Sequence, residues 1–139
     1  MWIIFLNSRE KREMPFILTK KFDFEAAHFI PAFPEGHKCR EMHGHSFKVV
    51  VRLEGEYDPE TGILIDFADV KAVVKPYIEY MDHTCLNTIA ERDNIPLLKN
   101  PTSENICIWL YHELAPKLPM LKSIEVQETC TSGAEYFKD

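Results

Sequence analysis

The chain has 139 residues, 45% of them hydrophobic, which suits one domain with a buried core. The formal net charge of −6 argues against nucleic acid or an anionic membrane surface as the main partner. A local basic patch for a small anion could still come from Lys20, Lys21, Lys38 and Arg40. The cysteines come without a secretory signal or a dense cysteine framework, so we expect reduced thiols and a cytoplasmic protein.

Residues 1–15 differ from the rest of the chain. The apolar run Trp2–Leu6 is too short for a secretory signal or a membrane span, and the charged run Arg9–Glu13 follows it. We therefore expect residues 1–15 to be an N-terminal extension and residues 16–139 to form a single domain.

Two strands with inward-facing histidines are predicted next. From Phe16 to His28 apolar residues alternate with polar ones, and His28 continues the apolar face, so a buried core histidine is the alternative to a functional one. A loop rich in Pro and Gly follows and contains Cys39. The next strand begins with His43 and His45. Their face continues with the apolar residues Phe47, Val49, Val51 and Leu53.

Helical spacing of apolar residues predicts two helices after these strands. The first covers residues 66–80, and Pro76 should kink or shorten it. Residues 84–101, which contain two prolines, are expected to form a long connection. Thr102 or Ser103 is a suitable N-cap for the second helix, whose apolar stripe belongs to the core.

The chain ends in a predicted hairpin, with strands at 122–130 and 134–138. On the first of them Glu128 has the parity of Ile124 and Val126, which places a carboxylate on the apolar face. Such a carboxylate needs hydrogen-bond donors or a fixed cation, which a ligand could supply. A structural salt bridge, or a solvent-facing strand end, is the alternative.

The histidines and Cys39 suggest a metal site. Imidazoles from His28, His43 and His45 would leave a fourth position open on Zn²⁺, as catalytic zinc sites require. Cys39 could fill that position and close the site, or it could stand off the metal as a base. Asp82 and His83 offer a further acid–base pair, in which the carboxylate orients and charges the imidazole.

These motifs together resemble the 6-pyruvoyl-tetrahydropterin synthase superfamily, and most closely its bacterial 6-carboxytetrahydropterin synthase branch. Three residues separate Cys39 from His43, as in the carboxy branch. The N-terminal extension is outside the family core, and the stretch from Thr88 to Leu98 is longer than usual. The matching segments are Phe24-Glu25-Ala26-Ala27-His28, Gly36-His37-Lys38-Cys39, His43-Gly44-His45, Gly62–Phe67, Asp82-His83, Pro101-Thr102-Ser103-Glu104 and Glu128-Thr129-Cys130-Thr131.

The resemblance implies an α+β tunnelling fold (T-fold). In that fold an antiparallel four-stranded sheet carries two helices on one face, in the order ββααββ. The resemblance also implies a homohexamer, a dimer of trimers, in which three sheets close edge to edge into a barrel and two such rings stack.

The resemblance further implies an activity. The family enzyme of this branch is a zinc-dependent lyase that converts 7,8-dihydroneopterin triphosphate to 6-carboxy-5,6,7,8-tetrahydropterin, releasing acetaldehyde and triphosphate, in queuosine biosynthesis. By resemblance, His28, His43 and His45 would bind the zinc. The catalytic residues would be Cys39, Asp82, His83 and Glu128.

Substrate binding is assigned by the same resemblance. Glu128 would anchor the small-molecule pterin substrate, and Thr102, Ser103 and Glu104 match a segment that helps to hold the pterin from a neighbouring subunit. Two alternatives remain open. One is a 6-pyruvoyl-tetrahydropterin synthase of biopterin synthesis, and the other is a non-catalytic zinc-binding module in which Cys39 is the fourth ligand.

Overall fold

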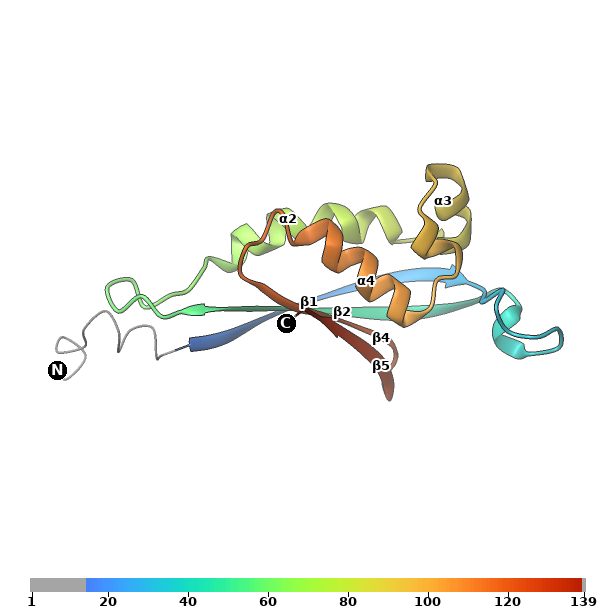
Figure 1. The fold of residues 1–139 in the computed structure, drawn as a ribbon, viewed down its shortest axis with the longest axis horizontal. Coiled ribbons are helices and arrows are strands. Elements are labelled where there is room, and N and C mark those ends of the chain that lie inside the picture. Colours follow the sequence, from blue (N-terminus) through green and yellow to red (C-terminus); the bar gives the residue numbers. More distant parts are fainter. Residues whose placement is uncertain (1–14, 139) are drawn as a thin grey trace.

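The computed structural model describes residues 15–138 of the chain. These residues form one curved sheet with all the α-helices on one of its faces (Figure 1). Residues 1–14 of the expected extension (1–15) lie outside the described part, and Pro15, its last residue, belongs to the first strand. The α+β class expected from the sequence is confirmed.

A long antiparallel hairpin forms the centre of the sheet. Strand β1 (Pro15–His28) pairs with β2 (His43–Glu56) without a break, from Pro15 opposite Glu56 to His28 opposite His43. The alternating pattern fixes this register, because a shift by one residue would turn every apolar side chain to the other face. His28 and His43 therefore face each other across the strands, at the end where the loop 29–42 joins them.

The sheet has five strands, and the expectation of four was wrong. The order is β3-β1-β2-β4-β5, in which β4 is Leu121–Thr129 and β5 is Ser132–Phe137. The additional strand β3 is only Thr84–Cys85, and it pairs with β1 in parallel, so the sheet is mixed. Two residues are too short to show an alternating pattern, so the sequence gives no signal for this strand.

Residues 15–138 contain three α-helices, where two were expected. Helix α2 is Phe67–Met81 and helix α4 is Ser103–Leu114, near the predicted positions. The supposed connection at 84–101 holds the third, α3 (Leu86–Asp93), and the 3₁₀ turn η3 (Pro96–Lys99). Helix α3 has only eight residues, and its buried Leu86, Ile89 and Ala90 follow the i, i+3, i+4 spacing of a helix.

Of the two effects expected of Pro76, a kink or a shortened helix, the shortening does not occur. Pro76 lies inside α2, which continues to Met81. Pro76 is exposed, and the carbonyl that loses its intrahelical partner there can be hydrated. Within residues 15–138, no helix is both long enough and apolar enough to cross a membrane.

The core lies between the sheet and the helices. Phe24 of β1 and Phe47 of β2 stack with their ring centroids 4.8 Å apart, and both are fully buried. Helices α2 and α4 cover them with the buried residues Val70, Val74, Ile78, Met81, Ile106, Leu110 and Leu114. Because His28 is buried on the same face, the hairpin carries one histidine directly into the edge of the core.

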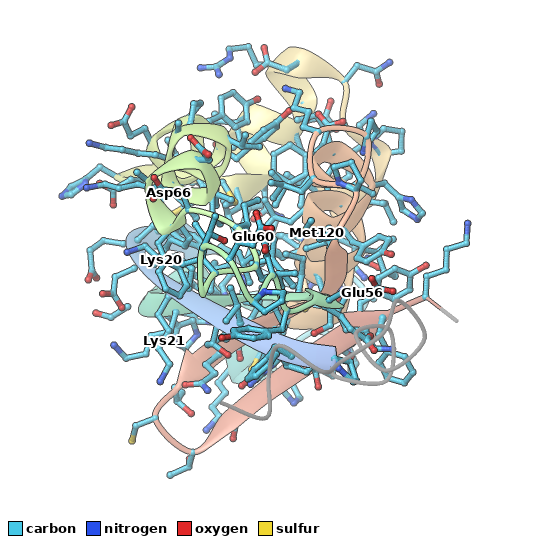
Figure 2. All side chains as sticks on the ribbon, turned by 90° about the vertical axis from the view of Figure 1, so that its left-hand side faces the viewer. Lys20, Lys21, Glu56, Glu60, Asp66 and Met120 are labelled. Carbon is cyan, nitrogen blue, oxygen red and sulfur yellow. The ribbon has the colours of Figure 1, made fainter. Side chains whose placement is uncertain are left out.

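The basic residues considered from the sequence do not gather into one patch. Figure 2 looks along the sheet from the end where β1 begins, and it labels Lys20 and Lys21 among the side chains seen there. Lys38 and Arg40 belong to the 3₁₀ turn η2 (Lys38–Arg40) in the loop 29–42, at the other end of the hairpin.

Candidate metal centre and active site

Three imidazoles meet at the end of the β1–β2 hairpin. His28 and His43 are cross-strand partners, and His45 is two residues further along β2 on the same face. One ring nitrogen from each lies within 4.8 Å of those of the other two. Among residues 15–138 this is the one group of three or more histidine, cysteine or carboxylate side chains with such spacing, so the expected cluster forms.

Backbone carbonyls fix the orientation of two of these rings. His28 Nδ1 lies 2.8 Å from the carbonyl oxygen of Pro101, and His43 Nδ1 lies 2.7 Å from that of Glu41. A carbonyl only accepts hydrogen bonds, so each Nδ1 must carry the proton. In the neutral ring the lone pair is then on Nε2, which is the arrangement that metal-binding histidines adopt.

Burial favours the neutral form of the rings that a metal needs. His28 is fully buried, and desolvation lowers its pKa below the ordinary value of 6.5, against the opposing hydrogen bond to Pro101. Desolvation also lowers the pKa of His45. The buried Nε2 atoms of both residues have no hydrogen-bond partner, which is costly unless another group occupies the space between them. The residues therefore fit a bound Zn²⁺.

The side chains of Asp82 and His83 are in contact with each other. Asp82 Oδ2 lies 2.9 Å from His83 Nδ1. The other carboxylate oxygen accepts the backbone N–H of Glu25 at 2.8 Å, and the N–H of His83 donates to the carbonyl of Glu25 at 2.6 Å. Because these bonds favour the charged form, the pKa of Asp82 is lowered, first by the N–H of Glu25 and then by His83.

The backbone of strand β1 therefore holds Asp82 and His83 in place. Glu25 is three positions before His28 on the same strand, so one rigid element positions both the metal cluster and the pair. His83 has a left-handed backbone (φ 59°), which turns the chain from α2 into β3 and leaves its imidazole exposed. A cleft of about 530 Å³ includes both His45 and His83 in its wall, together with Glu25 and Ser46.

Glu128 also reaches the cluster. Its carboxylate Oε1 lies 3.4 Å from His28 Nε2, and its side chain is 30% exposed. The residue sits where the pairing of β4 with β5 shifts by one position, at the end of the strand. The negative charge of Glu128 opposes the effect of desolvation on the pKa of His28, and its carboxylate is open enough to contact a ligand.

Cys39 lies outside the imidazole cluster. It belongs to η2, is half-buried, and is not among the residues whose ligand atoms converge. All four cysteines are free thiols, as expected. Cys39 thus occupies the loop that closes the histidine end of the hairpin, with its sulfur apart from the group of three ring nitrogens.

The segment 102–104 is placed less directly. Thr102 is the N-cap of α4, and its side chain accepts the N–H of Asn105 at 3.1 Å. Ser103 is buried, and Glu104 is exposed. Its link to the metal cluster runs through the carbonyl of the preceding Pro101.

Several supporting residues were not found from the sequence. The carbonyls of Glu41 and Pro101 orient two imidazoles, and the buried Asn87 holds Phe29, the residue after His28, through both its N–H and its carbonyl. Contacts with the backbone depend on where the chain folds back, so residue type and spacing give no signal for them.

Comparison with known proteins identifies the family. The sequence profile described as 6-pyruvoyl tetrahydropterin synthase matches residues 17–139. The chain belongs to the 6-pyruvoyl tetrahydropterin synthase family. It is 42% identical over 127 residues to the 6-carboxy-5,6,7,8-tetrahydropterin synthase of Synechocystis, covering 87% of this chain and 92% of that protein. It is 33% identical over 115 residues to the dihydroneopterin monophosphate aldolase of Pyrococcus furiosus, covering 81% of this chain and 89% of that protein.

A solved structure shares the fold of the chain. The 6-pyruvoyl tetrahydropterin synthase of Caenorhabditis elegans superposes with a TM-score of 0.78 at 24% identity, covering 90% of this chain and 96% of that one. The T-fold expected from the sequence is therefore confirmed, and the chain is an enzyme of the pterin synthase family.

Proposed function

We propose that this enzyme is a zinc-dependent 6-carboxytetrahydropterin synthase. Its substrate would be 7,8-dihydroneopterin triphosphate and its products 6-carboxy-5,6,7,8-tetrahydropterin, acetaldehyde and triphosphate, within queuosine biosynthesis. The observation that carries the proposal is the convergence of three imidazole nitrogens within 4.8 Å. The Synechocystis relative, 42% identical and named for this activity, supports the carboxy branch over the pyruvoyl branch.

The metal site of the proposal consists of His28, His43 and His45. A bound Zn²⁺ would supply Lewis acidity to oxygen atoms of the substrate side chain. Contacts within the chain hold the imidazoles in the form that binds a metal. The carbonyls of Pro101 and Glu41 hold two rings in the metal-binding tautomer, and burial lowers the pKa of His28 and His45, which favours their neutral form.

Proton transfer is assigned to two groups. Cys39 is proposed as the base that removes a proton as a thiolate, and its position outside the imidazole cluster supports this role over that of a fourth ligand. The imidazole of His83, oriented by Asp82 and exposed to the cleft, would exchange protons with the substrate.

Substrate orientation is assigned to Glu128. Its carboxylate is partly exposed and faces the cluster, so it can accept the paired N–H donors of a pterin ring beside the metal site. Thr102, Ser103 and Glu104 are proposed to contribute to pterin binding in a neighbouring subunit.

Mass spectrometry of the products tests the proposal. Wild-type enzyme and zinc are incubated with 7,8-dihydroneopterin triphosphate, and Cys39→Ala is run beside it. We expect the 6-carboxy product from the wild type, and a turnover about 10²–10⁴-fold lower from Cys39→Ala with its zinc retained. A 6-pyruvoyl product would instead assign the enzyme to biopterin synthesis. Loss of zinc in Cys39→Ala would support a closed site in which Cys39 is a ligand.

The proposed assembly is a homohexamer, a dimer of trimers. In the described part of the chain, β3 and β5 are the outer strands of the sheet, and unpaired outer strands favour edge-to-edge pairing between copies. Light scattering of active enzyme tests this assembly, and an active monomer would rule out a site shared between subunits.

A further inference from the structure

The turn that carries Cys39 is capped by a histidine that has no part in the metal cluster. His37 is the N-cap of η2, and its Nδ1 accepts the backbone N–H of Cys39 at 3.0 Å. A ring nitrogen that accepts from an amide carries no proton, so His37 is the neutral tautomer with its proton on Nε2. Its ring stacks on Phe33, with the centroids 4.1 Å apart and the planes 7° from parallel.

Other hydrogen bonds tie the same turn to the segment that directly follows His28. The carbonyl of Cys39 accepts the N–H of Ile30 at 2.8 Å. Arg40 donates from one guanidinium nitrogen to the carbonyls of Pro31 at 3.1 Å and Phe33 at 2.7 Å. The N–H and the carbonyl of Cys39 are therefore both paired, one by the side chain of His37 and the other by the chain just after His28.

We propose that His37 is a positioning residue for the Cys39 thiol, an inference that rests on the proposed function of Cys39 as a base. A single torsion separates the cysteine sulfur from its backbone, so the sulfur is only as well placed as the backbone of residue 39. The turn η2 has three residues, and its one side-chain cap comes from His37. The ring of His37 stacks on Phe33, whose carbonyl accepts a hydrogen bond from Arg40. The first part of the loop, at Phe33, is thereby joined to the turn η2.

The test compares three variants with the wild type in steady-state kinetics. In His37→Ala the N–H of Cys39 loses its acceptor, and we expect kcat to fall about 10- to 100-fold with KM changed less than about 3-fold. His37→Asn offers an amide oxygen, a common N-cap acceptor, and should recover kcat to within about 5-fold of the wild type. His112→Ala on α4 is the matched control and should leave both constants unchanged. Zinc content and circular dichroism should match the wild type in all three.

A double-mutant cycle separates positioning from a direct role. If His37 acts only through Cys39, then His37→Ala should change the residual activity of Cys39→Ala by less than about 2-fold. Full activity of His37→Ala, failure of Asn to restore kcat, or the same loss with and without Cys39 would each overturn the inference. Full activity of Cys39→Ala would instead remove the proposed function of Cys39 itself, which distinguishes the two failures.

Discussion

Asn87 offers a quantitative test of how the fold supports the metal cluster. Its side chain is 6% exposed, accepts the N–H of Phe29 at 3.0 Å and donates to the carbonyl of Phe29 at 2.8 Å. In Asn87→Ala both backbone groups lose this partner. At about 1–1.5 kcal/mol for each bond, the free energy of unfolding should fall by about 2–3 kcal/mol.

The assay is urea unfolding of metal-free protein, followed by circular dichroism at a fixed protein concentration. Asn105→Ala is the matched control, because the side chain of Asn105 makes one such bond, from Nδ2 to the carbonyl of Asn100 at 2.9 Å. The free energy of unfolding of Asn105→Ala should be lower than that of the wild type by about 1 kcal/mol. A loss for Asn87→Ala no larger than that of Asn105→Ala would refute the reasoning.

The Asn87→Ala substitution should also weaken metal binding. Phe29 follows His28 directly, so a loosened backbone at Phe29 reduces the precision with which the imidazole is held. We expect zinc affinity to fall by about 10- to 100-fold, the usual effect of removing a supporting group. Competition with a chromogenic chelator measures this affinity.

Three further predictions concern the site itself. The double variant His43→Ala/His45→Ala should lose stoichiometric zinc in elemental analysis, because one imidazole of the cluster remains, and retained zinc would exclude the assigned ligands. Glu128→Gln should weaken binding of a non-reacting pterin by about 1–3 kcal/mol in titration calorimetry, because a donor then faces the N–H groups of the ring, and equal affinities would mean that the pterin is anchored elsewhere. The third prediction follows from the lowered pKa of His28 and His45. Below the ordinary value of 6.5 the unfolded chain binds more protons than the folded one, so the unfolding free energy of metal-free protein should decrease as pH falls. Urea midpoints between about pH 7.5 and 5.5 measure the trend, and a rise in the midpoint toward acid would contradict it.

The sequence by itself determined the central hairpin and the set of imidazoles. Alternation fixes which face each residue of a strand takes, and a buried face permits one register. His28, His43 and His45 all carry the parity of the apolar residues, so their convergence follows once the two strands pair. The two longer helices were likewise visible, because their apolar spacing extends over several turns.

Only the tertiary structure decided the supporting contacts and the short elements. β3 has two residues and α3 has eight, too few for a periodic pattern to stand out from a connection. The supporting contacts mostly use backbone groups, which every residue possesses. They include the N–H of Glu25 that holds Asp82, the carbonyls of Glu41 and Pro101 that orient two imidazoles, and the N–H of Cys39 that His37 accepts. Which of these groups meets a given side chain depends on where distant segments pack, and that is a property of the folded chain.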